Sequence, residues 1–223
     1  VRLGAPFSAR FIEIEKDRLS SLLRDWMVKE SKRPSFIVKK VEDEKVVDIC
    51  GLEIRLRPDR VDILADSKSV LIDYKSGKVD RNDWLGQRPR DPQMIVYSLY
   101  SRPQAVTFAT VVPGECRFVG IAIDEGMLPG VKSLDNDNRW RESSGAADWE
   151  GLMVLWRGVI EGIARDFVGG NAAVDPAGGP TGKKSPCERC DQYLLCRVAE
   201  AVQSGDGGDD GEDEDDGGDS SDG

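Results

Sequence analysis

Apolar residues recur at helical spacing in several stretches of the chain. Leu19, Leu23 and Trp26 lie four and three positions apart, which places them on one face of a helix. Asp91 and Pro92 form a second helix start, because Asp can cap the first turn and Pro fits its first position. The predicted helices cover residues 13–29, 91–100 and 148–168.

Between the first and last of these helices, short runs of β-branched and aromatic residues are bounded by Gly, Pro and Asp. Such runs predict strands, here over residues 36–41, 46–50, 53–59, 70–75, 105–112 and 118–123. Residues 76–90 form a polar loop, and residues 128–147 form a polar connection without a clear period. The order of elements predicts an α/β fold, with a central mixed sheet over residues 36–123 flanked by the three helices.

The alternation of apolar side chains changes face within residues 53–63. The apolar residues Ile54 and Leu56 occupy even-numbered positions, whereas Val61 and Ile63 occupy odd-numbered positions. A β-bulge or bend near Pro58 would produce this change, and bulges are common beside active sites. The alternative is that the two halves are separate strands. In either case, the later half is expected to form a hairpin with residues 70–75.

The formal charge of −10 is concentrated at the C-terminus. Residues 204–223 hold ten of the 41 Asp and Glu residues and none of the 31 Lys and Arg residues, so the rest of the chain is balanced. This segment has no apolar residue to bury and is predicted to be a disordered acidic tail. Its simplest role is solubility, and the alternative is that it mimics DNA or binds a partner.

The apolar runs and the cysteines indicate the expected location of the protein and a candidate metal site. No apolar run approaches the roughly 20 residues that span a bilayer, and no secretory signal is evident, so we expect a cytoplasmic protein without a membrane contact. Three of the five cysteines, Cys187, Cys190 and Cys196, crowd into ten residues, which favours metal binding over disulfides. Cys50 and Cys116 fall in β-rich stretches and are expected to be small buried hydrophobes.

Asp59, Asp73 and Lys75 form the strongest chemical pattern. Residues two apart on a strand share a face, so Asp73 and Lys75 point the same way, and a hairpin would bring Asp59 beside Asp73. Two adjacent carboxylates repel unless a cation lies between them, and Mg²⁺ prefers oxygen ligands of this kind. The backbone carbonyl of Tyr74 can supply a third oxygen. Such a site can activate water, and Lys75 can stabilise charge on a phosphate under attack.

The strings RPDRVDIL and VLIDYKSGK resemble the second and third motifs of the PD-(D/E)-x-K nuclease superfamily, in its RecB/AddB-like branch. The string DPQMIVYSLY resembles a further motif of that branch, in which Gln93 and Tyr97 share a helix face toward the metal and DNA. The resemblance implies a restriction-endonuclease-like fold and a catalytic set of Asp59, Asp73, Lys75, Gln93 and Tyr97. It also implies a deoxyribonuclease that uses Mg²⁺ or Mn²⁺, with an exonuclease role in double-strand-break repair beside a helicase subunit or helicase-like region.

The resemblance extends to CERCDQYLLC, which is similar to an array that supplies three of four cysteines to a [4Fe–4S] cluster. It implies that Cys187, Cys190 and Cys196 are Fe–S ligands, with the fourth cysteine missing from this chain. A zinc site or reduced thiols are the alternatives. Leu56 stands where the family has Gly, and the family's first motif is absent, so we expect an N-terminally truncated nuclease domain over residues 1–200, with the cysteine segment at residues 175–200.

Basic residues surround the expected site. Arg57, Lys78, Arg81, Arg88 and Arg90 are predicted to bind DNA phosphates, with ordinary solvated loop charges as the alternative. Trp84 can stack on a base or cover the core, and we expect Arg60 to be an ion-pair partner rather than a catalyst. The competing function is an inactive module that binds DNA ends or a partner through a structural Fe–S or zinc site.

Overall fold

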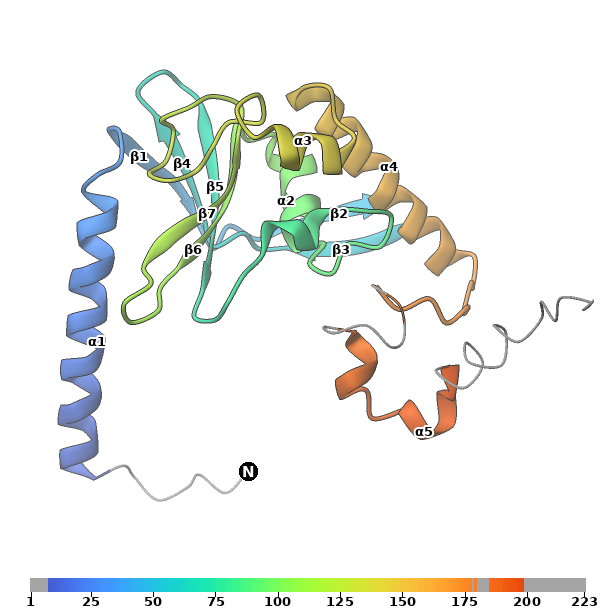
Figure 1. Cartoon of the computed structure of the whole chain (residues 1–223), viewed down its shortest axis with the longest axis horizontal. Coiled ribbons are helices and arrows are strands. Elements are labelled where there is room, and N and C mark those ends of the chain that lie inside the picture. The colour runs from blue at the N-terminus through green and yellow to red at the C-terminus, as the bar shows by residue number, and fades with distance from the viewer. Residues whose placement is uncertain (1–7, 178, 180–184, 199–223) are drawn as a thin grey trace, which may run out of the picture. The chain divides into compact units, whose positions relative to one another are not determined.

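The computed structural model describes residues 8–177, 179 and 185–198 (Figure 1). The chain divides into two compact units, residues 1–172 and 173–223, which are described separately. The predicted acidic tail, residues 204–223, and the end of the predicted nuclease domain lie outside the described residues. No helix among the described residues is long and apolar enough to cross a membrane.

A five-stranded mixed sheet forms the centre of the first unit, with strand order β1-β4-β5-β6-β7. Its pairs are antiparallel except β5 and β6, which run parallel because a helix connects them. The expectation of a mixed sheet flanked by helices is therefore confirmed. The strands are β1 (Phe36–Val41), β4 (Arg60–Leu64), β5 (Ser69–Lys75), β6 (Ala105–Thr110) and β7 (Arg117–Ala122).

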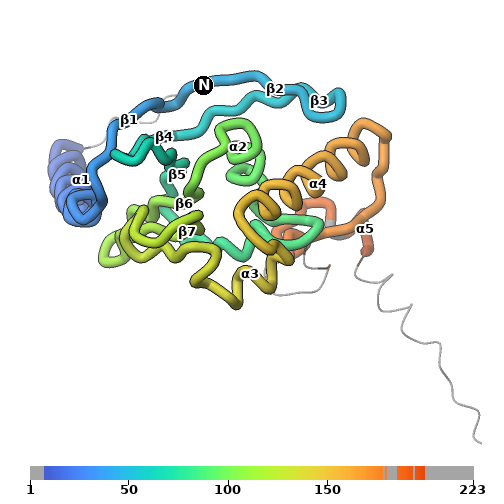
Figure 2. The backbone as a smooth tube through the Cα atoms, turned by 90° about the horizontal axis from the view of Figure 1, so that it is seen from above, coloured from blue at the N-terminus to red at the C-terminus, as the bar shows by residue number. Residues whose placement is uncertain are grey.

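The other two strands, β2 (Lys45–Ile49) and β3 (Leu52–Leu56), pair only with each other. Their hairpin lies beside α2 (Figure 2). The prediction of one sheet over residues 36–123 was therefore wrong for these strands. The change of apolar parity near Pro58 marks the end of β3 and the start of β4 in a different sheet, so the separate-strand alternative is correct.

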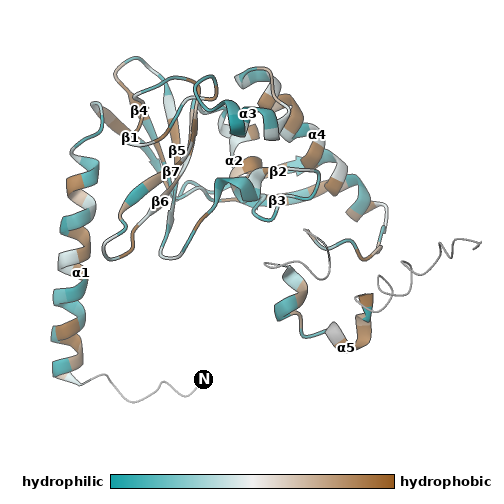
Figure 3. Cartoon of the chain, viewed as in Figure 1, coloured by the Kyte–Doolittle hydropathy of each residue, from teal (hydrophilic) through white to brown (hydrophobic). Residues whose placement is uncertain are grey.

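Helices cover both sides of the central sheet (Figures 1 and 2). α1 (Ala9–Glu30) lies on one side, and α2 (Gln93–Ser101) and α4 (Trp149–Val168) lie on the other. Figure 3 shows apolar residues recurring among polar ones along α1 and α4, as the sequence predicts. α2 begins at Gln93 with Pro92 at its N-cap, one residue later than predicted, so Asp91 is not the N-cap residue. The Asp91 carboxylate still accepts from the backbone N–H of Gln93 at 3.3 Å.

Strand alternation sends successive side chains to two different cores. Leu71 of β5 packs with apolar residues of α2 and α4. Val70 and Ile72 pack with Trp26 of α1 and Phe118 of β7. The parity of a residue on β4 or β5 therefore tells which side of the sheet its side chain faces, and this decides the location of the site.

Two regions differ from the sequence prediction. Residues 128–147 contain a short helix, α3 (Asn138–Ser144), and bury Leu134 and Trp140. Their apolar residues follow no regular period, which is why the pattern did not reveal them. Cys50 is exposed at the β2–β3 turn with φ 54°, so its predicted burial was wrong, whereas Cys116 is buried as expected.

In the second unit, the described residues form a short 3₁₀ helix, η2 (Pro186–Arg189), and one turn of α5 (Tyr193–Cys196). The hydroxyl of Ser185 accepts from the backbone N–H of Cys187 at 3.2 Å. Cys187 is partly exposed, and Cys190 and Cys196 are exposed. Among the described residues, no three His, Cys, Asp or Glu side chains gather to hold a metal ion.

Candidate active site

The β4–β5 hairpin brings Asp59 and Asp73 to adjacent positions. Arg60 pairs with Ile72 in the antiparallel register, so the residue before Arg60 falls opposite the residue after Ile72. The backbone N–H of Tyr74 donates to Oδ2 of Asp59 at 2.8 Å. This hydrogen bond holds the Asp59 carboxylate against β5 at the position where Asp73 projects.

Asp59, Asp73 and Lys75 face the same side of the sheet. Val61 and Leu71 belong to the core beneath α2 and α4, and each of the three site residues lies two or four positions from one of them. Lys75 confirms this orientation, because its Nζ lies 5.4 Å from the ring centroid of Phe108 in the same core. The structure therefore brings together the three residues that the sequence predicts.

Asp73 and Lys75 form an ion pair in a partly enclosed setting. Lys75 Nζ lies 2.8 Å from Oδ2 of Asp73, which is only 3% exposed, whereas Lys75 remains partly exposed. Lys75 Nζ also donates to Oε1 of Gln93 at 3.2 Å. The lysine is thus fixed between a buried carboxylate and the first residue of α2.

Gln93 and Tyr97 continue this chain of contacts along α2. Nε2 of Gln93 donates to the Tyr97 hydroxyl at 2.9 Å, and that hydroxyl donates to the backbone carbonyl of Arg57 at 3.1 Å. The predicted pair is therefore on one helix face directed toward Lys75. Its contacts position Lys75 and anchor the segment that leads into Asp59.

Burial and neighbouring charges both act on the Asp73 carboxyl group. Burial raises the pKa of Asp73, and the negative charges of Asp59 and Asp91 raise it further, while Lys75 opposes the change. Burial lowers the pKa of Lys75, but the Asp73, Asp91 and Asp59 carboxylates outweigh it, so the net direction is upward. The site therefore carries more negative charge than its single ammonium group balances, which favours a bound cation.

The residues present fit a divalent metal ion. Oδ2 of Asp73 is buried and accepts no hydrogen bond of good geometry, although Lys75 lies close to it. Asp59 lies in register with Asp73, and the carbonyl of Tyr74 belongs to the peptide unit next to Asp73. Two carboxylates and one carbonyl form an incomplete oxygen set of the kind that Mg²⁺ completes with water.

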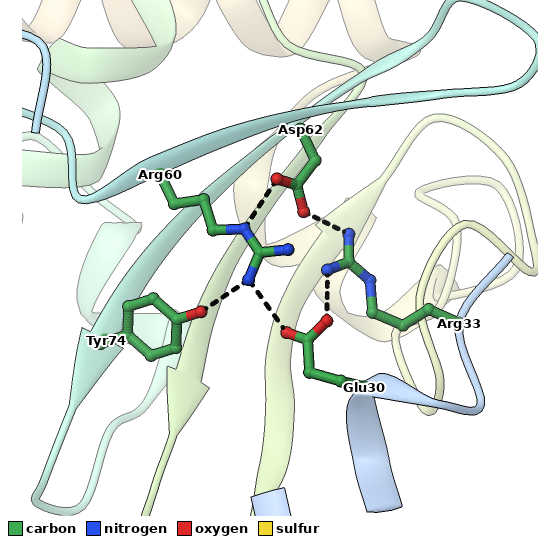
Figure 4. A network of polar contacts seen from close by, with 5 residues as sticks. All are labelled: Glu30, Arg33, Arg60, Asp62 and Tyr74. Carbon is green, nitrogen blue, oxygen red and sulfur yellow. Dashed lines mark hydrogen bonds and ion pairs between the residues drawn. The ribbon is translucent and has the colours of Figure 1, made fainter. Parts of the chain in front are cut away.

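On the opposite side of the sheet, three buried charges and the partly buried Arg60 form a closed ring (Figure 4). Arg33 contacts Glu30 at 2.9 Å and Asp62 at 2.7 Å, and Arg60 contacts Asp62 at 2.7 Å and Glu30 at 3.4 Å. Arg60 also donates to the Tyr74 hydroxyl at 2.8 Å. The expectation that Arg60 is an ion-pair partner is confirmed, and we call these four charges the Arg33 ring.

Several of the basic residues predicted to bind DNA have protein partners. Arg57 pairs with Glu42, Arg81 pairs with Asp137, and Nη1 of Arg90 lies 3.7 Å from Asp83. Arg81 also donates to the carbonyl of Gly120 at 3.1 Å. Lys78 and Arg88 are exposed, and DNA binding by this set stays a prediction.

Trp84 belongs to the core rather than to a base-stacking surface. Its side chain is 1% exposed, and its ring lies 5.0 Å from that of Phe108 and 6.2 Å from that of Trp156. Of the two alternatives left open by the sequence, core packing is therefore correct.

Two features near the site were missed from the sequence. Asp91 acts electrostatically on both Asp73 and Lys75, and its place before Pro92 indicated only a helix cap. Glu30 and Arg33 form half of the Arg33 ring, 29 to 30 residues before their partners, and no local spacing connects residues so far apart.

Two aspartates and a lysine on adjacent strands can hold a divalent ion that would activate water for attack on a phosphate. A family model described as the PD-(D/E)XK nuclease superfamily matches residues 3–197, and the chain belongs to this superfamily of metal-dependent nucleases. A comparison with curated proteins found no match. A solved structure titled "Crystal structure of SSO0001" aligns with 14% identity and a TM-score of 0.36, covering 71% of this chain and 60% of that chain.

Proposed function

We propose that this chain is a Mg²⁺- or Mn²⁺-dependent deoxyribonuclease with its active site at Asp59, Asp73 and Lys75. The observation that carries the proposal is the hydrogen bond from the Tyr74 backbone to Asp59, which holds that carboxylate in register with buried Asp73. Asp59, Asp73 and the carbonyl of Tyr74 would hold the metal. When bound, a divalent ion lowers the pKa of a coordinated water and polarises a phosphate oxygen.

The side chains account for the remaining chemistry. Lys75 keeps its positive charge because its pKa is raised, so it can orient the attacking oxygen and stabilise negative charge that develops on the phosphate. Gln93 fixes the Lys75 ammonium group, and Tyr97 fixes Gln93. Gln93 and Tyr97 therefore act mainly as positioning residues, whereas the motif resemblance implies that both belong to the catalytic set.

The finer biological role rests on motif strings alone. Membership of the RecB/AddB-like branch is supported by the strings RPDRVDIL and VLIDYKSGK and by the Gln93–Tyr97 pair. This branch implies an exonuclease role in double-strand-break repair. A helicase subunit or helicase-like region would be the partner, and the location would be the cytoplasm. The predicted DNA contacts of Arg57, Lys78, Arg81, Arg88 and Arg90 belong to the same proposal.

The predicted [4Fe–4S] cluster fits the described residues less well. A cluster takes four cysteines, and the segment offers Cys187, Cys190 and Cys196, which form no metal-binding group among the described residues. We therefore assign no step to a cluster. Iron and acid-labile sulfide analysis of the purified protein would test this part of the resemblance.

Cleavage of labelled linear DNA tests the proposed function. With Mg²⁺ or Mn²⁺ the wild-type protein should cleave, and EDTA should stop it. Asp59→Ala, Asp73→Ala and Lys75→Ala should each lower the rate by about 100-fold or more while circular dichroism stays unchanged. Asp66→Ala is the matched control, because Asp66 is exposed at the other end of the same hairpin and pairs only with Lys68 among the described residues. DNA binding without cleavage would favour an inactive binding module.

A further inference from the structure

A hollow of about 220 Å³ lies on the same side of the sheet as Asp59. Its floor is apolar, because Leu56 of β3 and Val61 of β4 line it and belong to the core beneath α2. Tyr97 and Tyr100 of α2 form part of its wall. We call this space the lysine–tyrosine hollow.

Ammonium groups dominate the charge of the hollow. Lys39 and Lys40 of β1 and Lys45 of β2 line it, against a single carboxylate, Asp43. Lys40 pairs with Asp43, whereas Lys39 forms no ion pair within the part of the chain that the structure describes. An apolar floor with a cationic rim matches a nucleotide, whose base or sugar is apolar on its faces and whose phosphate is anionic.

The hollow borders the candidate active site at the segment that leads into Asp59. Pro58 lines it and is bonded directly to Asp59. Tyr97 lines it as well, and the Tyr97 hydroxyl contacts Gln93, which in turn contacts Lys75. Val61 also lines the hollow, two positions from Asp59 on the same face of the sheet. A group in the hollow would therefore lie beside Asp59, close to a phosphate that contacts the metal ion.

We propose that the lysine–tyrosine hollow binds one nucleotide of a single DNA strand, next to the phosphate that is cleaved. The inference rests on the proposed function and names its substrate class. A single strand is favoured because a base in a duplex would first have to unpair and unstack before it could enter the hollow. Lys39 and Lys45 would contact its phosphates, and the tyrosines would contact its base or sugar.

Steady-state cleavage of a single-stranded oligonucleotide tests this assignment with two kinds of variant. Lys39→Ala/Lys45→Ala removes two cations and should raise KM roughly fivefold, with kcat retained and the salt slope of binding reduced by about 1.4. Its control, Lys16→Ala/Lys32→Ala, makes the same charge change at exposed residues on and just after α1. Ser101→Phe fills the hollow without changing charge and should also raise KM, whereas Ser21→Phe on exposed α1 should not.

The outcomes separate the inference from the function on which it rests. A higher KM in both hollow variants, with both controls like wild type, would support the hollow. If wild type cleaves and the hollow variants match their controls, the hollow is overturned and the nuclease stands. If wild type is inert with Mg²⁺ and Mn²⁺, the proposed function is overturned, and the inference falls with it.

Discussion

At the scale of single residues, Asp73 combines burial with nearby negative charge. It is buried, and its pKa is raised because burial and nearby carboxylates disfavour the charged form. A carboxyl group with a raised pKa in the folded state stabilises the fold most at acid pH, and that contribution is lost as pH rises through the folded pKa. Above the folded pKa, Asp73 therefore carries a charge that lowers the stability of the metal-free protein.

Asp73→Asn should consequently raise the melting temperature of the metal-free protein at pH 7 in EDTA, because the amide resembles the neutral acid. Wild type should gain stability when Mg²⁺ is added, by about 2.7 kcal/mol at 100 times the dissociation constant. The variant should gain none. Thermal unfolding followed by circular dichroism measures both effects, and a metal-free variant that melts well below wild type would contradict the argument.

Tyr74 connects the two sides of the sheet. Its backbone N–H holds Asp59, while its hydroxyl accepts from Arg60 of the Arg33 ring. Tyr74→Phe should loosen Asp59 and raise the Mg²⁺ concentration for half-maximal cleavage roughly tenfold, as the loss of a residue supporting a metal ligand does elsewhere. The KM for DNA should stay close to the wild-type value.

Tyr100→Phe is the matched control for this change. The Tyr100 hydroxyl likewise makes one hydrogen bond, which it donates at 2.9 Å to the carbonyl of Asp48 in β2, away from Asp59. The Mg²⁺ concentration for half-maximal cleavage by Tyr100→Phe should equal that of wild type. An equal shift in both variants, or no shift in Tyr74→Phe, would show that Tyr74 does not position the metal ligand.

The placement of Asp59, Asp73 and Lys75 could be predicted because strand alternation and a hairpin are local rules. Alternation also sends the side chains of Asp59 and Arg60 to opposite sides of the sheet, and Arg60 is part of the Arg33 ring. The ring itself could not be predicted, since Glu30 and Arg33 meet their partners only after the chain folds. Cys50 was placed incorrectly because the pattern did not show the left-handed turn between β2 and β3.

At the scale of elements, α1 depends on few contacts. Trp26 and Glu30 are the only buried residues among those described in this 22-residue helix. Trp26 packs on Phe118 at 5.0 Å, and Glu30 enters the Arg33 ring. The ring therefore fixes the end of α1 against β4.

Arg33→Leu should destabilise the protein by about 3–5 kcal/mol, because it leaves two buried carboxylates with Arg60 as the one remaining cation of the ring. Arg18→Leu is the control, since Arg18 pairs with Glu15 on the exposed part of α1 and its loss should barely change the free energy of unfolding. Urea denaturation measures the difference. Equal midpoints for the two variants would mean that the ring does not hold α1.

Element type was predictable where the period was regular, as in α1, α2, α4 and the strands of the central sheet. The pairing of β2 with β3 and the presence of α3 could not be predicted. The pairing of β2 with β3 outside the central sheet depends on packing against α2 and α4 rather than on the strand sequences. Residues 128–147 bury their apolar side chains one at a time, so no period marked α3.

At the scale of the whole molecule, the two sides of one sheet have different roles. One side carries the candidate active site, the lysine–tyrosine hollow and the helices α2 and α4. The other side carries the Arg33 ring and α1. Because Tyr74 contacts Asp59 through its backbone and Arg60 through its hydroxyl, the stability of the ring and the geometry of the metal site are expected to be linked.

Anomalous X-ray scattering from a crystal soaked in MnCl₂ tests the central claim most directly. The account predicts a strong manganese peak between the carboxylates of Asp59 and Asp73, with the carbonyl of Tyr74 among its ligands, and no such peak in Asp73→Asn crystals. A wild-type crystal that shows manganese only elsewhere, or the two carboxylates bound to no common ion, would contradict it.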